Sequence, residues 1–129
     1  MRTRHRTPRE RLGRLLRRRE HVDLAAMGPY ELAAFRFNHS DAGHTVAGLT
    51  RTLGVPKVSV GARGGSATEV RVTCAWELTW HQWSVDLGEE AGPVLEIAEG
   101  RRLAELEPAA RQWNAAAAAD GRITVAGGR

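Results

Sequence analysis

The residues best suited to proton transfer are two acids and a histidine within the tryptophan-rich stretch Glu69–Leu87. Glu77, His81 and Asp86 could act as general acids or bases if a cleft shifted their pKa values. In an extended backbone, Glu77 and His81 share the face opposite to the apolar positions of the stretch. We therefore expect Glu77 to face solvent and His81 to lie at the rim of a sheet. Because no nucleophile-elbow, Rossmann or Walker pattern accompanies them, the sequence favours a non-catalytic protein without a cofactor.

A second group with ligand chemistry is the short segment His39–His44, which holds two histidines and Asp41. Imidazole and carboxylate groups suit zinc or iron. However, no fourth ligand follows at a clear spacing, and loops that begin helices use the same residue types. We predict no metal site for the chain. The single cysteine, Cys74, belongs to no nucleophile motif and is expected to pack inward as a small hydrophobe.

The composition is that of a folded chain, with 42% hydrophobic residues among 129. One cysteine permits no internal disulfide, and no apolar run approaches the roughly 20 residues that a membrane span needs. These features favour a cytoplasmic protein with no membrane contact. Arginine outnumbers lysine eighteen to one, which we interpret as the coding bias of a GC-rich bacterial genome.

Basic residues are concentrated in the first twenty positions, where nine arginines and two glutamates give a net charge of +7. The arginines are Arg2, Arg4, Arg6, Arg9, Arg11, Arg14, Arg17, Arg18 and Arg19. Clustered arginine gives salt-dependent affinity for phosphates, so residues 1–26 are predicted to form a flexible arm that could contact nucleic acid. Two other interpretations stay open: a solvated tail without a partner, or a segment upstream of a true start at Met27.

Residues 46–63 have the spacing of a helix-turn-helix core, with Gly54 at the turn and Lys57 and Arg63 available to bases. This resemblance, together with the arm, would make the chain a nucleic-acid-binding regulator. The competing interpretation is that Lys57–Ala62 is a strand, because its residues alternate and a glycine-rich hairpin loop follows.

The elements that must position these residues begin with the stretch 69–87. Its even positions are apolar up to residue 80: Val70, Val72, Cys74, Trp76, Leu78 and Trp80. Period-2 alternation predicts a strand with one face in a core. After Trp80 the apolar positions become odd, as a bulge near His81–Gln82 would produce. We therefore predict one long, bent central strand; the rival interpretation is a helix over Trp76–Leu87, whose tryptophans also have helical spacing.

The remaining pattern completes an α+β domain over residues 27–129. Two N-terminal helices are predicted at Gly28–Phe37 and Ala42–Leu53, and strands at Lys57–Ala62 and Val94–Ala98 flank the central strand in an antiparallel meander. Five consecutive alanines predict a C-terminal helix over Pro108–Asp120, packed on the sheet. A short strand is expected at Arg122–Val125.

Four tryptophans are many for a chain of this length. Trp76, Trp80 and Trp113 are expected to fill the core, whereas Trp83 follows the change of parity and is expected on another face. Because tryptophan is enriched at interface hot spots, His81 and Trp83 are predicted to bind a protein partner or a second copy. The predicted function is a small non-catalytic binding protein, and the alternative is the nucleic-acid-binding regulator.

Overall fold

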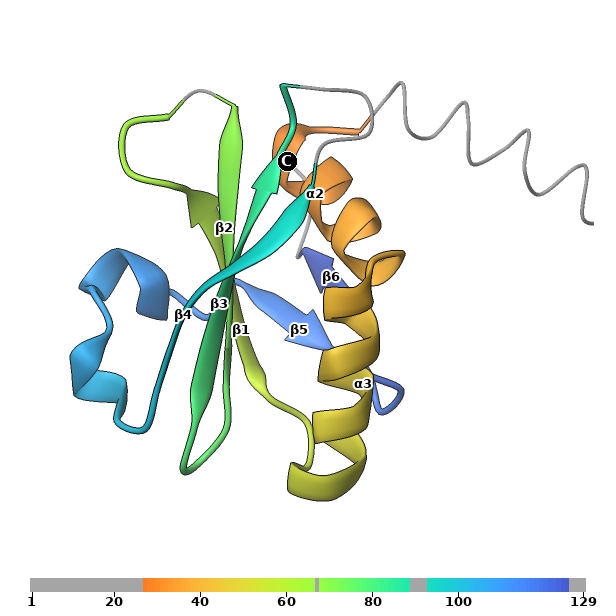
Figure 1. Ribbon diagram of the computed structural model, residues 1–129, viewed down its shortest axis with the longest axis vertical. Coiled ribbons are helices and arrows are strands. Elements are labelled where there is room, and N and C mark those ends of the chain that lie inside the picture. Colours follow the sequence, from red (N-terminus) through yellow and green to blue (C-terminus); the bar gives the residue numbers. More distant parts are fainter. Residues whose placement is uncertain (1–26, 67, 89–92, 126–129) are drawn as a thin grey trace, which may run out of the picture.

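The computed structural model describes residues 27–66, 68–88 and 93–125. In chain order the helices and strands are α2 (Pro29–Asn38), α3 (Asp41–Leu53), β1 (Lys57–Ala62), β2 (Glu69–Ala75), β3 (Trp80–Asp86), β4 (Val94–Gly100), β5 (Ala115–Ala117) and β6 (Ile123–Val125). The strands form one antiparallel sheet in the order β4-β3-β2-β1-β5-β6. Both helices lie on one face, and two short 3-10 turns, Leu103–Glu105 and Pro108–Arg111, lie on the other (Figure 1).

The two predicted N-terminal helices are confirmed, and their ends have local causes. Pro29 occupies the first turn of α2, where its missing N–H is harmless, and the Glu31 carboxylate accepts the Gly28 N–H at 3.0 Å. α3 ends at Gly54, whose φ of 95° lies in the region that favours glycine. Buried residues of both helices, among them the fully buried Phe37 and Val46, pack in the core against the sheet.

The main core lies between the helices and the sheet. Antiparallel pairing places Val72 beside Val60 on one side and Trp83 on the other. Even positions of β1 and β2 therefore share a face with odd positions of β3. The buried residues on this face are Val58, Val60, Val70, Val72, Cys74, Trp76, Trp83 and Val85. The predicted inward face of residues 70–76 is thus confirmed.

The prediction of one long central strand over residues 69–87 is wrong, because the chain reverses in the middle of this stretch. β2 ends at Ala75, the Trp76 N–H donates to the Thr79 carbonyl at 2.8 Å, and β3 begins at Trp80. The change of parity follows from this hairpin, since Ala75 pairs with Trp80 and even residues then face odd ones. Leu78, expected inward, sits in the turn with 78% of its surface exposed. The rival helix over residues 76–87 is equally wrong.

The prediction of a C-terminal helix over Pro108–Asp120 is also wrong, and so the predicted layout of the fold must be corrected. Pro108–Arg111 forms only a 3-10 turn, and three of the alanines form β5 between β1 and β6. Trp113 has a φ of 48°, which breaks any helix there. The Asn114 carboxamide then accepts the Val60 N–H and donates to the Val60 carbonyl, both at 2.8 Å. The helices that pack on the sheet are α2 and α3, whereas the predicted last strand is confirmed as β6.

The opposite face of the sheet is more polar. A small core of Ala75, Trp80, Leu106 and Ala110 forms where the 3-10 turns cover it, and Ser59, Thr73 and Ser84 are buried nearby. The helix-turn-helix interpretation of residues 46–63 is wrong, because Lys57–Ala62 is strand β1 rather than a recognition helix. Among the described residues, neither helix is long and apolar enough to cross a membrane.

Candidate functional site

The site is built by an irregularity in the pairing of β3 with β4. Gln82 pairs with Ala98 and Trp83 with Glu96, so Ile97 has no opposite residue. In regular pairing, residues three apart in a strand lie on opposite faces. The extra residue reverses this rule, and Glu96 and Glu99 both come to the helix side of the sheet. His81 pairs with Glu99 and shares the face of Trp83, so all three side chains meet there.

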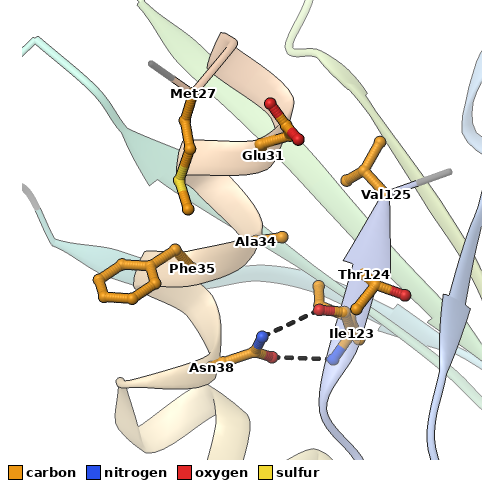
Figure 2. Close-up of a pocket in the computed structure, with 8 residues that line it drawn as sticks. All are labelled: Met27, Glu31, Ala34, Phe35, Asn38, Ile123, Thr124 and Val125. Carbon is orange, nitrogen blue, oxygen red and sulfur yellow. Dashed lines mark hydrogen bonds between the residues drawn. The ribbon is translucent and has the colours of Figure 1, made fainter. Parts of the chain in front are cut away.

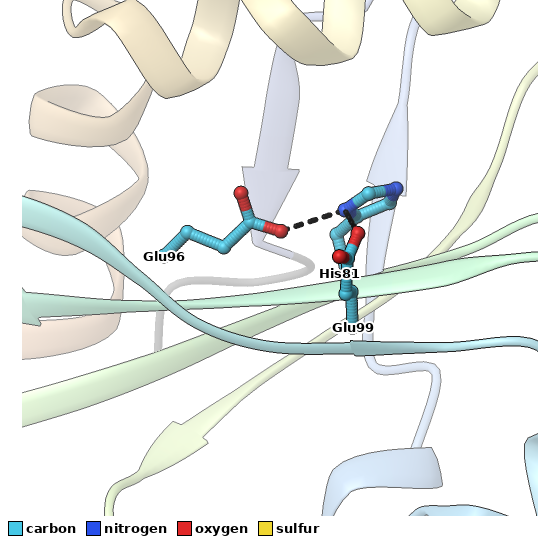
Figure 3. Close-up of side chains that lie close together, drawn as sticks. All are labelled: His81, Glu96 and Glu99. Atoms are coloured by element: carbon cyan, nitrogen blue, oxygen red, sulfur yellow. Dashed lines mark hydrogen bonds and ion pairs between the residues drawn. The ribbon is translucent and has the colours of Figure 1, made fainter.

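Both carboxylates approach the same nitrogen of the His81 ring, Nδ1 (Figure 3). His81 Nδ1 is 2.8 Å from Glu96 Oε2 and 3.6 Å from Glu99 Oε1. The His81 side chain is only 16% exposed, whereas those of Glu96 and Glu99 are 43% and 71% exposed. A proton on Nδ1 is therefore donated to Glu96, and solvent reaches the site from the carboxylate side. Within the described ranges, no other group of three or more His, Cys, Asp or Glu side chains converges in this way.

The other surfaces of the imidazole are held by the hairpin and the core. The ring stacks on Trp83 with centroids 5.8 Å apart, and the Trp76 ring meets it edge-on at 6.2 Å. Trp83 in turn packs edge-to-face on Phe37 of α2 at 5.0 Å. Thr79 Oγ1 lies 3.5 Å from His81 Nε2 and donates to the Gly100 carbonyl at 3.3 Å. The histidine is thus fixed in place while its Nδ1 edge stays accessible.

The chain matches no protein-family model, and neither curated proteins nor solved structures include a significant match.

The structure separates several residues that the sequence grouped. Trp83 is only 3% exposed and belongs to the core, so the expectation that it lies on another face is wrong. It supports His81 from the core side and presents no surface of its own to a partner. Glu77 is exposed in the β2–β3 turn, whereas Asp86 lies at the far end of β3 and accepts the Gly88 N–H at 2.8 Å. These two acids therefore do not join His81.

Sequence reasoning missed Glu96 and Glu99. The strand predicted at Val94–Ala98 included Glu96 but not Glu99, and neither residue was given a role. The only signal was a pair of acids three residues apart, Glu96 and Glu99, and they share a face only if a bulge lies between them. That bulge depends on the pairing partner, so it could not be inferred from β4 alone.

The segment His39–His44 is a loop and helix start, as predicted. His39 Nδ1 lies 2.8 Å from the Phe35 carbonyl, and its ring packs on Phe35 with centroids 4.3 Å apart. His44 and Asp41 are exposed and 4.0 Å apart. The nine predicted phosphate-contacting arginines all lie outside the described residues.

An open cavity of about 340 Å³ lies between α2 and β6, and its lining includes Met27, Phe35 and Val125 (Figure 2). Two of the polar side chains that line it, Asn38 and Glu31, are already hydrogen-bonded to backbone groups. Asn38 accepts the Ile123 N–H and donates to the Ile123 carbonyl, both at 2.9 Å, so its carboxamide covers the outer edge of β6. Glu31 is held by its bond to the Gly28 N–H. The cavity is therefore lined mainly by apolar side chains, and its Asn38 carboxamide serves to hold β6.

Proposed function

We propose that this chain is a non-catalytic binding protein that takes an extended, basic segment of a partner protein as an additional strand along β4. The observation that carries the proposal is the acidic character of that edge. Val94–Gly100 contains Glu96 and Glu99 and no basic residue, and both acids point to the same side.

The two edges of the sheet are unequal. β4 has seven residues and, among the described residues, pairs with β3 alone. β6 has three residues, and the backbone groups of Ile123 are bonded to Asn38. A long edge with free N–H and C=O groups is a template for strand addition. β4 is therefore the better edge for a partner.

The side chains of β4 define the chemistry of the added strand. Alternate residues of a strand point to opposite faces. On the helix side they would meet Glu96 and Glu99, which favour lysine or arginine. On the other face they would meet Leu95, which is 58% exposed and favours an apolar residue. The expected partner segment therefore alternates basic and apolar residues.

The same charges argue against a second copy of this chain. Two β4 edges brought together would place four carboxylates along one seam, and charged edge strands oppose edge-to-edge association. A protein partner of opposite charge is the better occupant, and a homodimer through β4 is disfavoured.

Selection from a random peptide library displayed on phage tests the proposal. We expect enriched peptides to alternate basic and apolar residues, and to bind an E96K/E99K variant at least tenfold more weakly, a change of about 1.4 kcal/mol. Glu77→Lys is the matched control, because Glu77 is an exposed acid in the hairpin turn and is not part of β4. Enrichment of acidic or purely apolar peptides, or binding unaffected by the double charge reversal, would contradict the proposal.

Contact with nucleic acid through residues 1–26 stays a prediction from the sequence, as does a cytoplasmic location. With β1 in place of a recognition helix, the nucleic-acid hypothesis depends on the arginines of the arm alone.

A further inference from the structure

The cluster on β3 and β4 has the donor set of a metal site. We infer that His81, Glu96 and Glu99 bind a divalent transition-metal ion through Nδ1 and one oxygen of each carboxylate. This inference does not require peptide recognition, and because it uses the same two carboxylates, a bound ion would compete with a basic segment for Glu96 and Glu99. It replaces the expectation, drawn from the sequence, that the chain has no metal site.

The distances suit a small cation. Two ligand atoms about 2.1 Å from a tetrahedral ion lie roughly 3.4 Å from one another. The distances from His81 Nδ1 to the carboxylate oxygens, 2.8 Å and 3.6 Å, fall on either side of that value. One candidate donor atom from each of the three side chains lies within 4.8 Å of the others. Small rotations of the two exposed glutamate side chains would complete the coordination.

The ligands are held by regular structure on three sides. His81 lies near the start of β3, paired with β2 through Cys74 and with β4 through Glu99. Its ring is clamped between Trp76 and Trp83. A ligand with so few alternative orientations loses little entropy on binding, which favours affinity.

The net charge of the three ligands also favours binding of a cation. A neutral imidazole and two carboxylates carry a charge of −2, which a divalent ion cancels.

The donor set selects the class of ion. One imidazole nitrogen with two carboxylate oxygens suits Zn²⁺, Co²⁺, Mn²⁺ or Fe²⁺; Mg²⁺ and Ca²⁺ prefer oxygen ligands alone. Three protein ligands leave at least one coordination position to water on the solvent side. The exposure of Glu99 keeps that side open.

Cobalt titration of the full-length chain, expressed without a histidine tag and freed of metal by a chelator, tests the inference. We expect one Co²⁺ per chain, visible by its d–d absorption and by quenching of tryptophan fluorescence, because two indoles lie next to His81. Zn²⁺ should displace it. H81Q and E96Q should each weaken binding by about 100-fold or more, at or above the upper end of the losses seen for outer-sphere partners.

His44→Gln is the matched control, since His44 is an exposed imidazole beside Asp41 and should leave cobalt affinity unchanged. Circular dichroism establishes whether each variant is folded. If H81Q unfolds, E96Q and E99Q test the inference instead, because both side chains are exposed and their replacement should leave the fold intact. The inference is overturned if the wild-type chain binds no stoichiometric cobalt, if E96Q and E99Q bind as tightly as wild type, or if binding is lost in H44Q. H81Q keeps both acids of β4. A negative result for cobalt binding therefore leaves peptide recognition as a separate question.

Discussion

Replacing Asn114 with alanine should loosen the whole C-terminal part of the sheet. The Asn114 carboxamide makes two hydrogen bonds of 2.8 Å to the Val60 N–H and carbonyl, just where the chain enters β5. A typical hydrogen bond contributes about 0.5–1.5 kcal/mol net, so the pair is worth about 1–3 kcal/mol. β5 has only three residues and a single pair, Val58 with Ala115, joins it to β1. Few other contacts can compensate for the loss.

Urea denaturation followed by tryptophan fluorescence measures this effect. With an m-value of about 2 kcal/mol/M, a loss of 2 kcal/mol lowers the midpoint by about 1 M. Gln112→Ala is the matched control, because Gln112 is an exposed amide in the same segment with one local side-chain bond, to the Pro108 carbonyl. Its replacement should cost less than about 0.5 kcal/mol. If Asn114→Ala is no more destabilising than this control, or if it increases the helical signal in circular dichroism, the account of the alanine segment is refuted.

Three other predictions concern single residues. A Cβ at Gly100 would collide with the Trp80 indole and the Glu105 carboxylate, whereas one at Gly61 would meet nothing within 4 Å. Gly100→Ala should therefore lower the free energy of unfolding by about 1–3 kcal/mol and Gly61→Ala by much less. Equal effects of the two substitutions would contradict the packing. Burial raises the pKa of the Cys74 thiol to about 12, so only about one thiol in ten thousand is ionised at pH 8. A disulfide reagent should therefore label Cys74 only after unfolding. Rapid labelling of the native chain would show that Cys74 is accessible. Hydrogen bonds from the backbone N–H groups of Arg102 and Arg101 lower the pKa of Glu105. The contribution of Glu105 to stability is therefore present above the ordinary carboxyl pKa and is lost as the pH falls through the lowered value. The stability difference between wild type and Glu105→Gln should shrink on acidification, and a constant difference from pH 7 to pH 2 would be inconsistent with this linkage.

Patterns that depend on neighbouring residues alone were predictable from the sequence. Pro29 and Gly54 mark the ends of the helices, and the alternation of residues 70–76 identifies the inward face of β2. The strand interpretation of Lys57–Ala62 was also confirmed, because its alternation and glycine-rich loop are local signals.

Features that depend on distant pairing were not predictable. The turn at residues 76–79 contains no glycine, proline or asparagine, so the hairpin carries no turn signal. The alanines of β5 have high helix propensity, but each alanine favours a helix by only a fraction of a kcal/mol over ordinary residues, and pairing with β1 and β6 outweighs it. In the same way, His81 was singled out from its position, whereas its two carboxylate partners depend on a bulge opposite β3.

The most direct measurement of the proposed recognition edge is an amide NMR titration of the full-length chain. The ligand is an eight-residue peptide that alternates lysine and valine, and the control is its counterpart with glutamate in place of lysine. Binding along β4 predicts shifts concentrated in Val94–Gly100 and the neighbouring residues of β3 with the lysine peptide only. Absence of shifts, equal shifts with both peptides, or shifts centred on β6 or the helices would contradict it.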